Sequence, residues 1–334
     1  MSRANPPTQA RSQGPKSPIT YSPAFTLVPT YECFNRCSYC NFRVDPGQNH
    51  WLTLEVARAR LEGLRKKGIR EILILSGEVH PASERRSPLI RLIYDLCQLA
   101  LEYGFIPHTN AGPLSRAEME LLRDVNGSMG LMLEQMRSDL PVHRHAPSKD
   151  PQVRLQQLVW AGELKIPFTT GLLLGIGETP QDWQDTLKVI TTVQEQYGHI
   201  QEVILQPHSP GQEQNDLGEP FSPHRLPEVI QLARELLPSS ITIQIPPNLV
   251  ADPQWLLRCL EAGARDLGGI VPKDEVNPDY AHLHLDQLRT LLNGQGWQLQ
   301  TRLATYPTYD DWLSPQVRQV VDHCRAEWAL SPEN

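Results

Sequence analysis

The sequence lacks the features that mark membrane, disulfide-rich and nucleic-acid-coating proteins. No apolar run approaches the roughly 18 residues that a membrane helix needs. Six cysteines in 334 residues are too few for a disulfide framework. The 31 Lys and Arg residues form no long stripe and are outnumbered by 38 Asp and Glu, which argues against a protein that coats nucleic acid. We therefore expect a globular protein of the reducing cytoplasm, with neither a membrane nor a nucleic-acid partner.

The first 23 residues also lack acidic side chains and any apolar periodicity, and they contain five prolines. Such a composition is typical of a disordered arm. We expect this arm at residues 1–23, a folded unit at residues 24–300 and a helical extension at residues 301–334.

Short apolar runs alternate with longer amphipathic segments in the remainder of the chain. The runs start about every 35 residues, which is the spacing of repeated βα units. Several are apolar almost throughout, as is typical of parallel strands that are buried on both faces. The expected strands are Ala24–Val28, Glu71–Leu75, Phe105–His108, Met129–Glu134, Phe168–Leu174, Ile200–Gln206, Ile241–Ile245 and Leu267–Val271.

Proline marks the start of several of the expected helices. A capping residue followed by proline fits the N-cap and the first helical position. The pairs are Ser87-Pro88, Asp150-Pro151, Thr179-Pro180, Ser222-Pro223 and Asp252-Pro253.

Eight strand–helix units close most economically into a (β/α)8 TIM-type barrel, and a partly open rim is compatible with the pattern. A doubly wound open sheet is the competing architecture, because periodicity alone does not separate the two. In a barrel, the functional end lies where the strands finish at their C-terminal ends.

Three of the six cysteines follow the first expected strand, with the spacing Cys33-x3-Cys37-x2-Cys40. A structural zinc site normally takes four protein ligands, and no fourth Cys or suitably spaced His lies nearby. A thioredoxin-like pair would leave Cys33 unexplained, and haem attachment needs a histidine at position 41, which is Asn41. Three thiolates on a tight loop suit three irons of a 4Fe-4S cluster, with the fourth iron open. A zinc-stabilised binding module is the alternative from another class.

The cysteine loop resembles the signature of the radical S-adenosylmethionine (SAM) enzymes. The resemblance implies that the open iron binds the amino and carboxylate groups of SAM. It also implies one-electron cleavage of SAM to a 5′-deoxyadenosyl radical, which takes a hydrogen atom from the substrate. The cofactor carries this chemistry, and the protein positions it.

Further stretches resemble the SAM-binding motifs of this family. Ser76-Gly77-Glu78 resembles the Gly-Gly-Glu motif that holds the methionine amino group, with serine in place of the first glycine. Gly175 and Gly177 belong to a stretch that resembles the motif beside the adenosine, where glycine lets a ligand approach the backbone.

Three more side chains are candidates for contacts with SAM. Glu134 closes the fourth expected strand and could accept hydrogen bonds from ribose hydroxyls. Arg154 could pair with the cofactor carboxylate, and the ring of Tyr39 could pack on adenine. Each of them also has a plain structural interpretation, as a rim, surface or loop residue.

Polar residues at the ends of other expected strands are candidates for binding the substrate. Barrel geometry would direct them toward one cavity. They are His108, Asn110, Gln206, His208 and Asn248. Cys97, Cys259 and Cys324 lie in helical patterns and are interpreted as buried small hydrophobes.

Several stretches resemble one subgroup of the radical SAM enzymes, the CofG-type family that forms the deazaflavin FO (7,8-didemethyl-8-hydroxy-5-deazariboflavin). The resemblance implies ring closure with loss of ammonia from an adduct that a CofH-type enzyme supplies, and an electron donor such as flavodoxin or ferredoxin. The alternative within the class is a CofH-type enzyme, which couples tyrosine to a diaminouracil, or another radical SAM paralogue. The resemblance assigns no catalytic residue. The stretches are Pro107–Asn110, Ser128–Glu134, Thr169–Gly171, Gln201–Gln206, Gly268–Pro272 and Val276–Pro278.

Overall fold

The computed structural model describes residues 16–210, 221–250, 252–271, 275 and 285–330. Its sheet has the strand order β2-β3-β4-β5-β6-β7-β8-β1-β9, and β1 also pairs with β2. This additional pairing closes the first eight strands into a barrel, and every pairing is parallel. The strands are β1 (Ile19–Leu27), β2 (Glu71–Leu75), β3 (Ile106–Asn110), β4 (Ser128–Gly130), β5 (Phe168–Leu174), β6 (Ile200–Pro207), β7 (Thr242–Gln244), β8 (Asp266–Ile270) and β9 (Leu299–Thr301).

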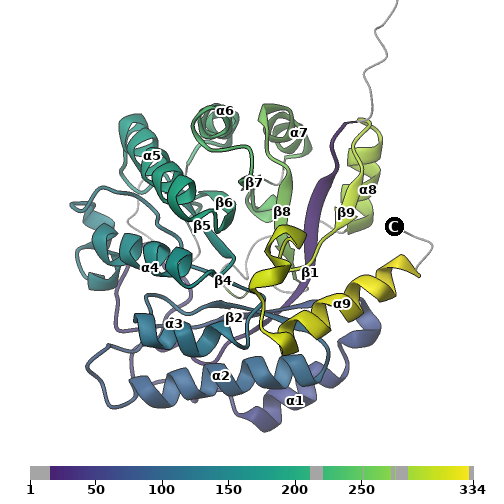
Figure 1. Cartoon of the computed structure of the whole chain (residues 1–334). Coiled ribbons are helices and arrows are strands. Elements are labelled where there is room, and N and C mark those ends of the chain that lie inside the picture. Colours follow the sequence, from purple (N-terminus) through teal and green to yellow (C-terminus); the bar gives the residue numbers. More distant parts are fainter. Residues whose placement is uncertain (1–15, 211–220, 251, 272–274, 276–284, 331–334) are drawn as a thin grey trace, which may run out of the picture.

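The helices lie outside the ring of strands (Figure 1). The prediction of a (β/α)8 barrel is thus confirmed, and the open doubly wound sheet is excluded by the pairing of β1 with both β2 and β8. The helices are α1 (Leu54–Glu62), α2 (Arg86–Glu102), α3 (Arg116–Arg123), α4 (Pro151–Glu163), α5 (Pro180–Tyr197), α6 (Leu226–Leu236), α7 (Pro253–Ala262), α8 (Leu285–Asn293) and α9 (Pro315–Ala329).

The strand bounds differ from the expected ones at both ends of the barrel. β1 begins at Ile19 rather than Ala24, because Ile19–Tyr21 pairs with β9, a strand that the sequence pattern did not predict. Residues 1–15 of the expected arm lie outside the described residues. β4 ends at Gly130, although the backbone of Leu131 and Glu134 still donates hydrogen bonds to β5. The division into arm, barrel and extension stays a prediction.

The capping pairs start helices at three of the five expected places. The side chains of Asp150, Thr179 and Asp252 cap α4, α5 and α7, each with proline at the start of the helix. Ser87 instead lies inside α2, and Ser222 precedes the short 3-10 helix Pro223–Arg225 without a side-chain cap. These two predictions are wrong because the helical turn starts before the proline in α2 and is of the tighter 3-10 type at Pro223.

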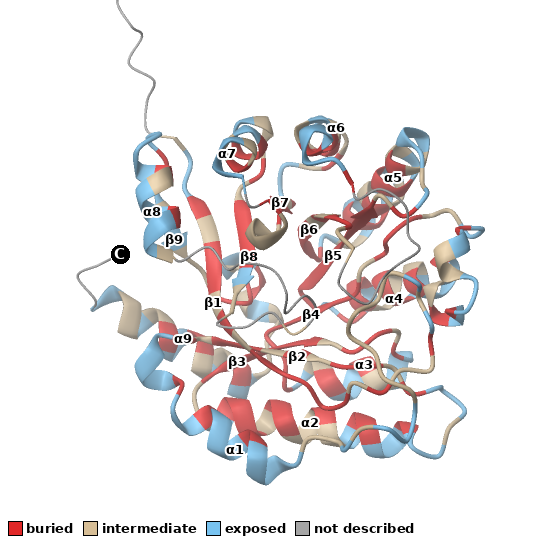
Figure 2. Cartoon of the chain, turned by 180° about the vertical axis from the view of Figure 1, so that it is seen from behind, coloured by how far each residue is buried: buried red, intermediate tan, exposed pale blue. Residues whose placement is uncertain are grey.

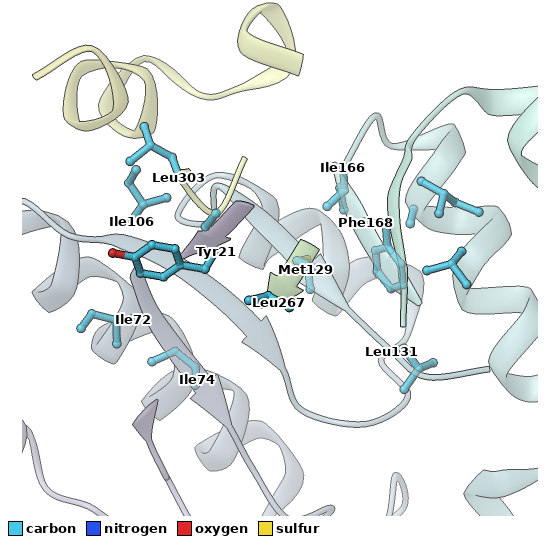
Figure 3. Close-up of a cluster of buried hydrophobic side chains, with 14 of the residues drawn as sticks. Tyr21, Ile72, Ile74, Ile106, Met129, Leu131, Ile166, Phe168, Leu267 and Leu303 are labelled. Atoms are coloured by element: carbon cyan, nitrogen blue, oxygen red, sulfur yellow. The ribbon is translucent and has the colours of Figure 1, made fainter. Parts of the chain in front are cut away.

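The main hydrophobic core fills the layer between the strands and the helices. Ile72 and Ile74 of β2 are fully buried in it, as are Met129 and Phe168 on the adjacent strands β4 and β5 (Figure 3). The outward faces of the helices are exposed, whereas the strands are mostly buried (Figure 2). Cys97, Cys259 and Cys324 are buried in this core, as expected. In the part of the chain that the structure describes, no helix is long and apolar enough to cross a membrane.

The residues after β9 close the N-terminal end of the barrel. The carbonyl of Ala304 accepts hydrogen bonds from Ser128 on β4 and Gln201 on β6. Arg302 donates two hydrogen bonds to Asp266, the first residue of β8, and also contacts Glu202. In the part of the chain that the structure describes, the N-terminal end of the barrel is therefore covered, and the barrel opens toward the C-terminal ends of its strands.

Candidate active site

The cysteine loop follows β1 at the open end of the barrel. Cys33, Cys37 and Cys40 are free and partly buried. The amide of Cys40 donates to the carbonyl of Cys37 at 3.2 Å, which makes a tight turn between the last two cysteines. Burial raises the pKa of Cys33 and raises that of Cys37 to about 12. Because a bound metal deprotonates a thiol outright, this partly buried set of thiols fits a cationic iron cluster.

Two polar side chains within the loop hold its shape. Glu32 is buried and accepts hydrogen bonds from the amide of Gly47, the indole of Trp51 and the guanidinium of Arg85. Asn35 donates to Glu78 at 2.9 Å and accepts from the amide of Ser148 at 3.2 Å. The loop is thereby fixed to the segments that surround it.

The loop after β2, which contains Ser76, Gly77 and Glu78, lies against the cysteine loop. The amide of Gly77 donates to the carbonyl of Thr30 at 2.8 Å, and a Cβ on Gly77 would lie 2.2 Å from the carbonyl oxygen of Glu32. The hydroxyl of Ser76 donates to the carbonyl of Gly77. Glycine is therefore needed at position 77, while serine is compatible with position 76.

Glu134 is the centre of a buried polar cluster beside the cysteines. It has a φ of 65°, which is uncommon for a residue other than glycine. Its carboxylate accepts hydrogen bonds from Tyr39 at 2.6 Å and His143 at 2.9 Å, and it pairs with Lys149. Burial alone would raise the pKa of Glu134, but the charge of Lys149 and the bond from His143 hold it well below its usual range. Glu134 is thus held as a carboxylate beside the cysteine loop, and the charge of Lys149 compensates its negative charge.

Arg154 extends this cluster from α4. It is buried and donates to the carbonyls of Met132 and Ser148, and its guanidinium lies 3.8 Å from the carboxylate of Glu134. It is therefore part of the framework that orients Glu134.

The glycine-rich segment after β5 is shaped by Glu178. Gly175 and Gly177 have φ angles of 88° and 102°, a region that favours glycine. The carboxylate of Glu178 accepts from the amides of Gly175 and Ile176, at 2.6 and 2.7 Å, and from the indole of Trp183. Glu178 thus braces the turn.

Three adjoining cavities occupy the open end and the interior of the barrel. A cavity of about 130 Å³ is lined by Gly175, Gly177, Tyr39 and His208. A second, of about 120 Å³, contacts Tyr39 and His208 as well as Cys40 and Glu134. A third, of about 220 Å³, extends down the barrel interior, and Met132 lines both it and the second. The cysteine loop therefore communicates with the inside of the barrel.

The candidate substrate residues divide between these cavities. His108, Asn110 and Asn248 line the interior cavity, whereas Gln206 and His208 line the second one beside Cys40. The expected single pocket is thus two cavities in contact.

The closed end of the interior cavity is charged. Arg302, Glu202 and Glu71 line it. Burial raises the pKa of Glu202 to about 7, against the opposing charge of Arg302. Both carboxylate oxygens of Glu202 are engaged, since Thr169 donates to Oε2 and Tyr306 to Oε1.

Sequence reasoning missed several residues of the site. Lys149, His143 and Asn35 match no motif residue, and only their contacts in the structure show that they belong to the site. Glu32 stands next to Cys33, which is the signal that could have found it. Glu178 ends the glycine-rich stretch that resembles the motif beside the adenosine, but it was not among the candidate site residues. Val276–Pro278 and Pro272 of the subgroup stretches lie outside the described residues.

A barrel with three cysteines on its first loop defines the class of the radical SAM proteins, and residues 27–190 match the model of the radical SAM superfamily. The chain is 62% identical over 308 residues to 7,8-didemethyl-8-hydroxy-5-deazariboflavin synthase of Trichormus variabilis, covering 92% of this chain and 91% of that protein. Against the synthase of the same name from Synechocystis, it is 63% identical over 303 residues, or 90% and 97% of the two chains. The chain belongs to the family of 7,8-didemethyl-8-hydroxy-5-deazariboflavin synthases, and its superfamily implies a 4Fe-4S cluster and SAM.

Solved structures share the fold at low sequence identity. The FeFe-hydrogenase maturase HydG from Carboxydothermus hydrogenoformans has a TM-score of 0.72 at 16% identity, with 93% of this chain and 78% of that chain covered. Methylornithine synthase has a TM-score of 0.64 at 17% identity, with 85% and 84% covered.

Proposed function

We propose that this chain is the CofG-type enzyme that forms FO from 5-amino-5-(4-hydroxybenzyl)-6-(D-ribitylimino)-5,6-dihydrouracil. SAM is cleaved reductively to 5′-deoxyadenosine and methionine, and ammonia is released as the third ring closes. The observation that carries the proposal is the identity of about 62% to proteins named FO synthase over nine-tenths of the chain.

Cys33, Cys37 and Cys40 would hold the 4Fe-4S cluster through three irons. When bound, the cluster supplies the electron that cleaves SAM. The chain's own groups position SAM: the Ser76–Glu78 loop on the methionine side, and Gly175, Gly177 and the Tyr39–Glu134 pair on the nucleoside side. Met132 lines both the cavity beside Cys40 and the interior cavity, so SAM bound at the cysteine loop would lie next to a substrate in the barrel interior. This adjacency supports a radical reaction, since the reacting atoms must be in contact.

The partners in this proposal are a CofH-type enzyme that supplies the adduct and an electron donor such as flavodoxin or ferredoxin. The interior cavity has hydrogen-bonding residues on its wall, among them Asn110 of β3, Gln244 of β7 and Asn248 of the 3-10 helix Pro247–Leu249. These would suit the ribityl chain and the uracil ring of the adduct.

The deciding experiment is anaerobic reconstitution followed by incubation with SAM, a reductant and the defined adduct. We expect a brown protein with about four irons per chain, 5′-deoxyadenosine, and a blue-fluorescent deazaflavin. Consumption of tyrosine and diaminouracil without deazaflavin would instead identify a CofH-type enzyme. One zinc per chain and no sulfide would identify a zinc-stabilised binding module.

A further inference from the structure

His108 lies at the middle of the barrel wall and lines the interior cavity. It belongs to β3, is 9% exposed and faces Gly130 of β4. A Cβ on Gly130 would lie 2.8 Å from Nε2 of His108. Nε2 of His108 therefore lies beside Gly130, and both residues line the interior cavity.

Hydrogen bonds fix which nitrogen of His108 carries the proton. The hydroxyl of Ser128 donates its single proton to the carbonyl of Ala304 at 2.7 Å. The same oxygen lies 2.7 Å from Nδ1 of His108, so it must accept the Nδ1–H bond there. Because a neutral imidazole has one N–H, Nε2 is left with a lone pair.

The surroundings keep this imidazole neutral. Burial, the largest effect, lowers the pKa of His108; Glu71 opposes this effect, and Arg302 adds to it. Among the residues that the structure describes, Nε2 has no hydrogen-bond partner. The cavity therefore contains a neutral base whose lone pair is available to a bound molecule.

We propose that Nε2 of His108 accepts the proton that the substrate releases as the third ring closes, and that Ser128 is the positioning residue that holds the required tautomer. The inference rests on the function proposed above. The carboxyl group of Glu202 also lines the cavity, and its pKa is raised to about 7. It is unsuited to this role because both of its oxygens already accept hydrogen bonds.

The proposed step balances with the reactants of the proposed function. The adduct loses ammonia and two hydrogens, of which one passes as an atom to the 5′-deoxyadenosyl radical. The other leaves as a proton to Nε2 and an electron, and the 4Fe-4S cluster that the superfamily implies would take this electron in place of the one used to cleave SAM. The imidazolium then gives its proton to the departing ammonia, so ammonium is the product and His108 is again neutral.

The test compares His108→Gln, Ser128→Ala and the control His199→Gln, a buried histidine away from the cavity. Gln keeps a hydrogen-bonding group but cannot act as the base, and general-base catalysis is worth about 10²–10⁴-fold. We expect H108Q to make FO at least about 100-fold more slowly while still forming 5′-deoxyadenosine, so that the ratio of deoxyadenosine to FO rises. S128A should raise the ratio less, and H199Q should leave it unchanged.

The ¹⁵N resonances of His108 in the oxidised holoenzyme give a second readout. The wild type should show a protonated Nδ1 and a bare Nε2, and S128A should lose this preference. A protonated Nε2 in the wild type would overturn the inference. So would FO formation by H108Q at the wild-type rate, or an equal loss of FO and 5′-deoxyadenosine in H108Q. If the wild type formed no deoxyadenosine, the proposed function would fail, while the ¹⁵N spectrum would still decide the tautomer.

Discussion

Gly130 of β4 leaves the space that the imidazole of His108 on β3 occupies. A Cβ at position 130 would approach Nε2 to 2.8 Å, which is closer than two unbonded atoms pack. The absence of a side chain at Gly130 on β4 thus makes room for the ring of His108 on the neighbouring strand β3, at the wall of the interior cavity.

Gly130→Ala should therefore displace the imidazole and disturb its bond to Ser128. We expect FO formation to fall at least about tenfold and the free energy of unfolding to fall by about 1–3 kcal/mol, the usual cost of overpacking. Turnover and denaturant unfolding measure the two effects. Gly63→Ala is the matched control, because no atom lies within 4 Å of its Cβ and its φ is −83°. Equal behaviour of the two variants would contradict the importance of this contact.

Cys37→Ala should abolish SAM cleavage and leave most of the barrel folded, because the cysteine loop lies outside the hydrophobic core. Iron analysis, 5′-deoxyadenosine formation and circular dichroism measure these outcomes. Cys259→Ala is the control: Cys259 is fully buried in the core, so this variant should lose some stability and keep its iron. Normal deoxyadenosine formation by C37A would show that the ligand assignment is wrong.

Arg302→Met should destabilise the closed end of the barrel. Asp266 is completely buried and accepts two hydrogen bonds from the guanidinium of Arg302. Removing one partner of a buried ion pair leaves an uncompensated charge, which costs about 3–5 kcal/mol. Arg318→Met, which removes an exposed pair with Asp322, should cost under about 1 kcal/mol. Denaturant unfolding of both variants measures the difference, and similar losses would refute this role of Arg302.

Acid should destabilise the protein through His199. Burial lowers its pKa from 6.5 to about 4 in the folded chain. Between these values the unfolded chain binds the proton of His199 more readily than the folded chain does. The contribution of His199 to the free energy of unfolding is therefore fully present above pH 6.5 and is lost as the pH decreases toward 4. At 1.36 kcal/mol per pKa unit, the loss is of the order of 3 kcal/mol. Unfolding measured at several pH values should show a smaller slope in His199→Gln; an unchanged slope would mean that another group titrates.

The sequence alone determined the repeated strand–helix units and the spacing of the cysteines, whereas closure of the sheet into a barrel was decided by the pairing of β1 with both β2 and β8. Parallel strands buried on both faces appear as continuous apolar runs, so the expected bounds of β2 and β5 equal the observed ones. The spacing of Cys33, Cys37 and Cys40 is equally local. Such features depend on neighbours in the chain, and a single sequence therefore displays them.

Only the tertiary structure decided the polar contacts at the site and the extent of β1. The bond from Ser128 to Ala304 joins residues 176 positions apart, and that bond assigns the proton of His108. Lys149 reaches Glu134, and Arg302 reaches Asp266, from separate elements. Closure of the barrel brings these groups together in a region with little water, where each buried charge needs a partner, and no local pattern in the chain records which partner that is.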